Sequence, residues 1–206
     1  MIAILDCEGA EAGGVKRALD GLQVDAIPAD AADAIERASK IILPHSRSLS
    51  LTVAAMRDRQ LVMPLLRAID RGRPVLGISA GFHLLLDVSY EEGQHTGLGV
   101  VHGAAKRLDF GTHPAAKHFS IPHQGWNQVR WSVECPLTAG LRSGEYFYFD
   151  HSYFGEPLDE RLVAASCTHG VEFSAIIWKD HIFGTQFLPE RSDDAGRALL
   201  TNFAAM

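Results

Sequence analysis

The sequence is poor in cysteine and has no pattern that would join its cysteines. The three present, Cys7, Cys135 and Cys167, are widely spaced and form no C-x-x-C pair. This usage is typical of a reducing compartment and argues against a disulfide framework or a zinc site. No apolar run approaches the roughly 18 residues of a membrane-spanning helix, and the chain opens on an apolar strand rather than a signal peptide. We therefore expect a cytoplasmic protein.

Positive charge is also scarce. Nineteen Lys and Arg against 25 Asp and Glu give a formal net charge of −6. This acidic balance argues against nucleic acid and anionic membranes as main partners. With 206 residues, of which 47% are hydrophobic and 21% charged, the composition is that of an ordinary globular protein. Since we find no linker, repeat or low-complexity segment, we expect one domain over residues 1–206.

The first half of the chain alternates short apolar strands with helical segments. This order predicts βαβ units and a parallel sheet. Sites in such sheets lie at the carboxyl ends of the strands. The Gly-rich loop 7–14, residues 44–47 and residue 79 should therefore meet on one face. The expected strands are 1–6, 24–28, 40–44 and 75–78, and the expected helices are 15–22, 31–38 (with Asp30 as N-cap) and, in two pieces, 51–71.

After about residue 86, short β-prone runs replace this alternation. They predict an antiparallel or mixed layer that extends the sheet, closed by a C-terminal helix over 193–206. The fold class expected from the whole pattern is α/β, with helices packed around a mixed sheet. The β-prone runs are 98–101, 105–110, 127–133, 146–154, 162–168, 174–178 and 182–187.

The segment 74–86 contains a G-x-S-x-G turn between a buried strand and an apolar helix. Gly77 and Gly81 would let the strand and helix pack closely, and Ser79 would be presented at the bend with backbone N–H groups, such as that of Ala80, behind it. These are the features of a nucleophile elbow with an oxyanion site. A plain strand–turn–helix crossover is the alternative, because the pattern is short.

Ten histidines raise the question of a metal, but none shows the spacing of a metal site. We expect no metal and no cofactor. His45, His83, His123 and His151 are nevertheless placed where they could share the site face. Lone histidines of this kind are more often hydrogen-bonded structural residues.

Aromatic residues mark two further segments. In YFYFDHSY, residues 146–153, they alternate, which indicates a strand with one face in the core or, alternatively, an interface or pocket wall. Trp126 and Asn127 follow Gly125 at an expected turn into a strand. An exposed tryptophan there would suit a contact with a partner protein.

Several segments together resemble the glutamine amidotransferase subunit of imidazole glycerol phosphate synthase, a class I (triad-type) glutaminase, over nearly the whole length. PH-x-GWN and YFYF-x-HSY are specific to this subunit rather than to class I glutaminases at large. The matching pieces are ILD at 4–6, ILP at 42–44, PVLGI-x-x-G at 74–81, LLL at 84–86, PH-x-GWN at 122–127, YFYF-x-HSY at 146–153 and G-x-QF-x-PERS at 184–192.

The resemblance implies a flavodoxin-like α/β fold and histidine biosynthesis. It also implies a heterodimer with a (β/α)8-barrel cyclase that uses ammonia released from glutamine, so glutamine or a related small molecule is the implied ligand. The interface side of the family corresponds here to Gly125, Trp126, Asn127, Tyr148, His151 and Arg191.

The family's catalytic residues do not carry over. Ser79 replaces the elbow cysteine and Leu188 replaces the histidine of QFHPE, so only the triad acid, Glu190, remains. The Gly-rich oxyanion loop reads His45-Ser46-Arg47, and His83 stands where the family has a substrate-holding glutamine. Changes at four functional positions indicate a natural paralogue that has left glutaminase chemistry.

The chemistry of the substituted residues favours an impaired enzyme that still binds a partner. A serine hydroxyl needs an adjacent base, leucine cannot accept a proton, and loss of a triad base costs on the order of 10⁴- to 10⁶-fold in rate. Arg47 or Arg191 could pair with the Glu190 carboxylate. Two alternatives stay open: a serine hydrolase or acyltransferase that uses Ser79 with His83, His45 or His151 as base, and a glutaminase that works through rewired residues.

Overall fold

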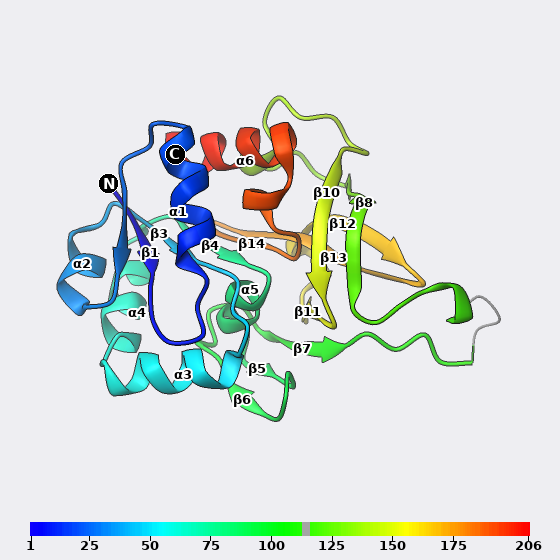
Figure 1. Ribbon diagram of the computed structural model, residues 1–206, viewed down its shortest axis with the longest axis horizontal. Helices are drawn as coiled ribbons and strands as arrows, with labels where there is room; N and C mark the ends of the chain where they lie inside the picture. Colours follow the sequence, from blue (N-terminus) through cyan, green and yellow to red (C-terminus); the bar gives the residue numbers. More distant parts are fainter. Residues whose placement is uncertain (113–115) are drawn as a thin grey trace.

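The core of the protein is a mixed β-sheet. The computed structural model describes residues 1–112 and 116–206. Within them, five neighbouring strands run parallel from β2 to β14, and three antiparallel strands follow. Figure 1 shows this sheet and its helices. Its strand order is β2 (Ala26–Ala29), β1 (Ile2–Leu5), β3 (Lys40–Leu43), β4 (Val75–Ile78), β14 (Ile182–Thr185), β13 (Val171–Lys179), β12 (Val163–His169) and β9 (Arg130–Trp131).

Helices cover both faces of the sheet, as predicted (Figure 1). The apolar faces of α1 (Ala12–Gly21) and α6 (Asp193–Ala205) pack on one side, against Ile4, Ile42 and other residues. The second core lies on the other side of the sheet. It receives residues from α2 (Ala32–Arg37), α3 (Leu49–Asp58), α4 (Val62–Asp70) and α5 (Ala80–Leu85). β1 and β4 are buried over all four residues, and β3 is buried over its last three, Ile41–Leu43, which is why these strands read as continuous apolar runs.

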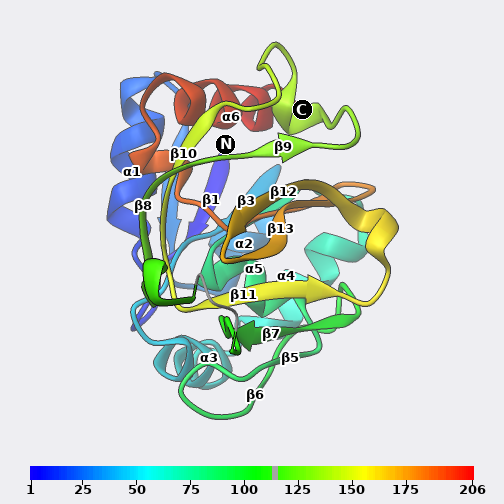
Figure 2. The same ribbon diagram turned by 90° about the vertical axis from the view of Figure 1, so that its right-hand side faces the viewer.

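Two smaller sheets flank the main one (Figure 2). An antiparallel ribbon pairs β8 (His123–Gln128) with β10 (Tyr146–His151). The other sheet has the order β11 (Tyr153–Pro157), β7 (Gly103–Arg107), β5 (Val88–Ser89) and β6 (His95–Thr96). Short 3-10 turns cover Ala116–His118 (η1), Pro136–Thr138 (η2), Glu160–Leu162 (η3) and Pro189–Arg191 (η4). The antiparallel extension expected for the second half is thus confirmed, although β5 and β6 were not predicted.

Three local predictions were wrong. Residues 98–101 form no strand, because the N–H groups of Leu98, Gly99 and Val100 donate to carbonyl groups at the end of α5 and cap that helix. The first helix begins at Ala12 rather than residue 15 and so includes two glycines of the supposed loop. Asp30 does not cap α2, whose N-cap is Ala31.

The glycines of the elbow let three backbone segments come into direct contact. A Cβ on Gly81 would lie 2.0 Å from the carbonyl oxygen of Leu43 and 2.7 Å from that of Pro44. A Cβ on Gly77 would lie 2.6 Å from the carbonyl oxygen of Gly81. The ends of β3 and β4 therefore converge with the start of α5, as predicted from the spacing of the two glycines.

We predict that Gly81→Ala lowers the free energy of unfolding by more than about 2 kcal/mol, because the new methyl group meets backbone atoms that cannot rotate away. The control is Gly21→Ala at the end of α1, where a Cβ meets nothing within 4 Å; it should change stability by less than about 1 kcal/mol. Urea unfolding measures both. Equal effects of the two substitutions would contradict the predicted clash at Gly81.

Candidate functional site

Ser79 connects β4 to α5 in a strained backbone conformation. Its φ is 52° and its ψ is −112°, a combination that costs a non-glycine residue of order 1–3 kcal/mol. The bend is held by the Ser79 N–H, which donates to the carbonyl oxygen of Thr185 on β14 at 2.6 Å. The Ser79 carbonyl oxygen in turn accepts from the N–H groups of Phe82 and His83. The predicted elbow geometry is therefore present.

The exposure predicted for the Ser79 hydroxyl is wrong. Ser79 is 2% exposed and Ala80 is 1% exposed. The helix that follows buries all of its residues, so the bend faces packed chain rather than solvent. Across residues 1–112 and 116–206, no imidazole nitrogen lies within hydrogen-bond distance of the Ser79 hydroxyl oxygen. A serine without such a contact has no group positioned to take its proton.

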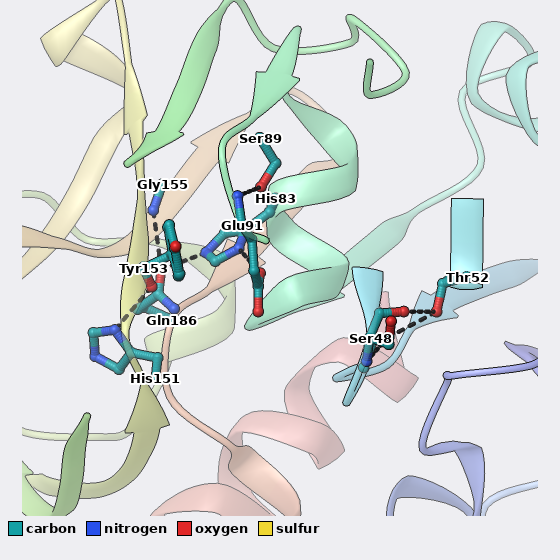
Figure 3. A network of polar contacts seen from close by, with 10 residues as sticks. Ser48, Thr52, His83, Ser89, Glu91, His151, Tyr153, Gly155 and Gln186 are labelled. Atoms are coloured by element: carbon teal, nitrogen blue, oxygen red, sulfur yellow. Dashed lines mark hydrogen bonds and ion pairs between the residues drawn. The ribbon is translucent and has the colours of Figure 1, made fainter. Parts of the chain in front are cut away.

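His83, one turn along α5, makes its hydrogen bonds to groups other than Ser79 (Figure 3). Its Nδ1 lies 3.2 Å from a carboxylate oxygen of Glu91, and its Nε2 lies 3.1 Å from Oε1 of Gln186. The Gly155 N–H donates to the same Gln186 oxygen, which fixes that oxygen as an acceptor. Both ring nitrogens of His83 thus face acceptor oxygens, so neither nitrogen is positioned to take a proton from Ser79.

His151 is likewise fully engaged. Its Nδ1 lies 2.9 Å from the carbonyl oxygen of Tyr153, and its Nε2 lies 3.0 Å from Nδ1 of His123. Burial and the neighbouring His123 ring lower the pKa of His151 well below its usual value. The ring is neutral, but it offers no free nitrogen to Ser79.

His45 differs from the other two candidate bases. Its Nδ1 is buried and has no hydrogen-bond partner among the described residues. Burial lowers the pKa of His45, while the charges of Glu11, Glu91 and Asp150 act in the opposite direction. Its ring therefore senses acidic groups from several segments around the carboxyl ends of the strands. Of the four histidines predicted to share one face, His83 acts on the pKa of both His45 and His151, and His123 contacts His151 on the inner side of the ribbon.

The loop that follows His45 is pinned by side chains. The Ser46 hydroxyl contacts the Thr52 hydroxyl at 2.8 Å and donates to the Gly9 carbonyl oxygen at 3.1 Å. Thr52 and Ser48 appear with this network in Figure 3. Arg47 is exposed and its Nε lies 2.5 Å from the Glu11 carboxylate. Residues 7–11 and 45–48 therefore meet at the carboxyl edge of the sheet, as predicted.

Leu188 lies close in the chain to the strand that borders the elbow. β14 runs parallel to β4 with Thr185 opposite Ile78, so residues 186–190 leave the sheet beside Ser79. Leu188 is 1% exposed and packs in the same core as Phe147, Phe149 and Phe187. Its N–H donates to the Tyr148 carbonyl oxygen at 2.9 Å. This side chain is a packing residue and supplies no proton acceptor.

Glu190 is a carboxyl group without a partner. Part of the side chain reaches solvent, but its Oε2 is buried and makes no hydrogen bond within the part of the chain that the structure describes. Burial raises the pKa of Glu190 to about 7. The two arginines considered as partners pair elsewhere: Arg47 with Glu11, and Arg191 with Glu11 at 3.6 Å and with Asp150 at 3.7 Å.

A polar cleft of about 870 Å³ lies beside Glu190, between α1, η4 and α6. It does not include Ser79. Within residues 1–112 and 116–206, no group of three or more His, Cys, Asp or Glu side chains is placed to hold a metal ion. No helix in the same ranges is both long and apolar enough to span a membrane.

The outer face of the β8–β10 ribbon is aromatic and exposed. Trp126 is 48% exposed and its ring meets that of Tyr148 edge-on at 6.0 Å. Asp150 continues this face and contacts Arg191. The predicted turn at Gly125–Asn127 is wrong, since these residues lie inside β8, although the predicted exposure of Trp126 is confirmed. Phe147, Phe149 and His151 point inward, as the alternation predicted, so the assignment of His151 to the interface side is wrong: the residue is 6% exposed and lies on the inner face of the strand.

Sequence reasoning missed two residues of this region, Gln186 and Glu91. Gln186 is fully buried and joins His83 to the backbone of β11 through its amide oxygen. Its position directly after β14 was the available signal, because polar residues at strand ends border sites in parallel sheets. Glu91 follows β5, a two-residue strand that the sequence pattern did not reveal.

The chain is similar in sequence to known proteins over almost its whole length. The family model for glutamine amidotransferase class-I matches residues 4–206. The imidazole glycerol phosphate synthase subunit HisH of Geobacter sulfurreducens is 38% identical over 205 residues, which cover 100% of this chain and 98% of that protein. HisH of Gloeothece citriformis is 39% identical and covers 98% and 94% of the two chains.

Solved structures share the fold. A crystal structure of a glutamine amidotransferase superposes with a TM-score of 0.75 at 16% identity and covers 100% of this chain and 99% of that one. The structure of PurLQS from Thermotoga maritima gives a TM-score of 0.73 at 20% identity, with 99% and 97% covered. The predicted class I glutamine amidotransferase fold is confirmed by these matches together with the family model.

We predict that Glu190→Gln stabilises the protein at pH 8 by at most about 3 kcal/mol, because a pKa raised from 4.5 to about 7 penalises ionisation in the folded state at about 1.4 kcal/mol per unit. The penalty is absent below pH 4.5, where the carboxyl is protonated folded and unfolded. It grows between pH 4.5 and 7 and is constant above. Denaturant unfolding at pH 4.5 and 8 measures this, with Glu134→Gln at an exposed position as control. An equal effect of Glu190→Gln at both pH values would contradict it.

Proposed function

Since this chain belongs to the class I glutamine amidotransferase family, we propose that it is a relative of the glutaminase subunit of imidazole glycerol phosphate synthase that binds a partner and hydrolyses glutamine poorly or not at all. HisH proteins match it over their full length. Their name makes them subunits of imidazole glycerol phosphate synthase, and we propose histidine biosynthesis as the pathway to which this chain is related. Ser79, Leu188 and Glu190 are taken as its three triad positions.

The observation that carries the proposal is the burial of Leu188. Its side chain occupies the hydrophobic core and cannot accept a proton, while Ser79 lies beside the strand that leads to it. A hydroxyl without an adjacent base is a far weaker nucleophile than a cysteine thiolate. The partnerless, raised-pKa carboxyl of Glu190 is consistent with a triad acid that has no imidazole left to orient.

The substrate side of the site also argues against glutaminase chemistry. The loop at the proposed oxyanion position reads His45-Ser46-Arg47 rather than a run of glycines. The Ser46 hydroxyl ties this loop to Gly9 and Thr52. His83 is held between Glu91 and Gln186 and is not free to contact a ligand without breaking one of these bonds. Burial of Ser79 leaves little access to the elbow.

Partner binding is supported by what the surface retains. Trp126, Tyr148 and the Asp150–Arg191 pair form a continuous outer face on the ribbon and η4. Exposed tryptophan and tyrosine beside an arginine are the residue types that dominate binding energies at protein interfaces. We propose that this docking face (Trp126, Tyr148, Asp150 and Arg191) binds a (β/α)8-barrel cyclase or a close relative of it.

We predict that the purified protein releases no more glutamate from glutamine than its Ser79→Ala variant, alone or with the barrel cyclase and its nucleotide ligand. The reason is the absence of a proton acceptor at position 188. The double variant Ser79→Cys, Leu188→His restores both missing groups and serves as the comparison. Partner-stimulated release by the native chain, well above the Ser79→Ala background, would overturn the proposed loss of activity.

We predict that Trp126→Ala weakens binding to the barrel cyclase by about 30-fold or more, the loss typical of a central aromatic contact. The control is Met63→Ala, at an apolar residue of α4 that is 57% exposed, and it should leave the affinity unchanged. Titration calorimetry of the two chains measures both. Unchanged affinity of the Trp126 variant would place the interface elsewhere.

A serine hydrolase or acyltransferase remains the second candidate, favoured by the strained conformation of Ser79 and by the unpartnered Nδ1 of His45. Of the three histidines proposed as base, His45 alone keeps a free nitrogen within the described ranges. We predict that a fluorophosphonate probe does not label Ser79, because the hydroxyl has no base and little access. Labelling that disappears in both Ser79→Ala and His45→Gln would favour this second candidate.

A further inference from the structure

Two buried histidines form a hydrogen-bonded relay on the inner face of the β8–β10 ribbon. Nδ1 of His123 lies 3.0 Å from Nε2 of His151. On one side, Nδ1 of His151 lies 2.9 Å from the Tyr153 carbonyl oxygen. On the other side, the Asn127 amide nitrogen lies 3.2 Å from Nε2 of His123. The relay thus runs from Asn127 through both rings to Tyr153. Figure 3 shows the contact between His151 and Tyr153 at one end of it.

The backbone at the Tyr153 end determines where the protons sit. A carbonyl oxygen only accepts, so Nδ1 of His151 carries the proton and its Nε2 is a lone pair. That lone pair must accept from Nδ1–H of His123, which leaves Nε2 of His123 as a second lone pair. This nitrogen then accepts from the Asn127 amide group.

The other end of the relay gives the same assignment independently. The Asn127 amide nitrogen also donates to the Thr168 carbonyl oxygen at 3.0 Å, and the Gln128 N–H donates to the Asn127 amide oxygen at 2.8 Å. The amide orientation is therefore fixed, with its nitrogen toward His123. Both histidines must be neutral and protonated on Nδ1, and an added proton on either ring would face an N–H group.

The surroundings offer nothing to stabilise an added charge. His123 and His151 are 3% and 6% exposed, and His123 stacks on Phe149 with ring centroids 4.6 Å apart. Among the described residues, the titratable groups that act on the pair are histidines. His169 of β12, stacked on His123 at 4.0 Å, acts on both rings, and His123 and His83 of α5 act on His151. Burial, with a further contribution from His169, lowers the pKa of His123 to about 3.

The relay sits directly behind the docking face. In the antiparallel register His123 is opposite His151, Gln124 opposite Asp150, and Trp126 opposite Tyr148. The rings of His123 and His151 therefore hold the end of the ribbon against β11 and β12, while the next residues on the same strands point outward. Loss of the relay frees the segment that positions Asp150 and Trp126.

We propose that the Asn127–His123–His151–Tyr153 relay is a proton-sensitive clasp that orders the docking face when both rings are neutral and releases this end of the ribbon when they are protonated. One consequence rests on the proposed docking role: the affinity for the partner should decrease as the pH is lowered. The release itself is a property of the isolated chain.

The first test reads the rings directly. Ring 1H–15N correlation spectra at pH 7.5 are expected to show His123 and His151 both protonated on Nδ1. A proton on Nε2 of either ring would overturn the relay. This measurement needs no variant and is unaffected by any failure of a mutant to fold.

The second test follows opening by hydrogen exchange between pH 7.5 and 5. His123, with a pKa of 6.5 when open and about 3 when closed, by itself multiplies the opening constant by about 30 over this range, and the lowered pKa of His151 acts in the same direction. Between pH 7.5 and 5, the opening constants of amides in β8 and β10 should therefore rise about 30-fold or more relative to those of amides in β2, at the far edge of the sheet. The exchange rates are first corrected for their intrinsic pH dependence. Equal gains at both places would overturn the clasp.

The matched variants are His123→Asn, which keeps a donor but cannot be protonated, and His118→Asn at an exposed position. In His123→Asn, the rise in the opening constant on acidification should be about 30-fold smaller than in the native protein. In His118→Asn, it should equal the native rise. Binding of the barrel cyclase at pH 7.5 and 5.5 completes the set, with a loss of affinity expected at the lower pH. If the barrel cyclase does not bind at any pH, the proposed function is contradicted. The hydrogen-exchange result then tests the clasp by itself.

Discussion

The contact on which the site depends is one between backbones. The carbonyl groups of Leu43 and Pro44 lie where a Cβ of Gly81 would be, so the end of β3 rests directly on the first turn of α5. The ring of Phe82 fills the space above Gly155 and Gly184, where a Cβ would come within 2.4 Å and 2.6 Å of it. Because each of these approaches is closer than a side chain allows, the positions of β3, β4, β14 and β11 are set relative to one another.

The fold places fewer demands on the side chains around this contact than on its backbone. A nucleophile elbow, an oxyanion loop and a triad acid need exact side chains for chemistry, but the fold needs only the glycines and the apolar strands. Leu188 adds buried apolar surface to the segment that follows β14, and fully burying such a side chain contributes about 2 kcal/mol. A leucine at this position therefore favours stability rather than acid–base chemistry.

The interior and the surface of the ribbon are mechanically linked. Tyr148 faces outward beside Trp126, yet its backbone carbonyl group accepts from the Leu188 N–H and its own N–H donates to the Ser192 hydroxyl oxygen. The stacked rings of Phe147 and Phe187, 4.0 Å apart, join the same strand to the segment after β14. A protein bound on the outer face would therefore act on the residues next to the elbow through a single strand.

Much of the fold could be predicted because its signals are local. Continuous apolar runs give β1, β3 and β4, and the alternation in residues 146–151 gives both faces of β10. The partners in the site could not be predicted, because they come from distant segments. His83 meets Glu91 from an unpredicted turn and Gln186 from 103 residues away. Whether Ser79 is open to solvent depends on the packing of all these segments, which no short pattern records.

The strain at Ser79 has a consequence for how such bends are interpreted. Its positive φ is imposed by the hydrogen bond to Thr185 and by the helix that begins at Ala80, neither of which involves the hydroxyl group. The distortion therefore belongs to the topology and does not depend on the chemistry of the side chain. In this architecture a strained residue at the tip of the bend is expected whether or not it acts as a nucleophile, so its torsion angles alone say nothing about catalytic activity.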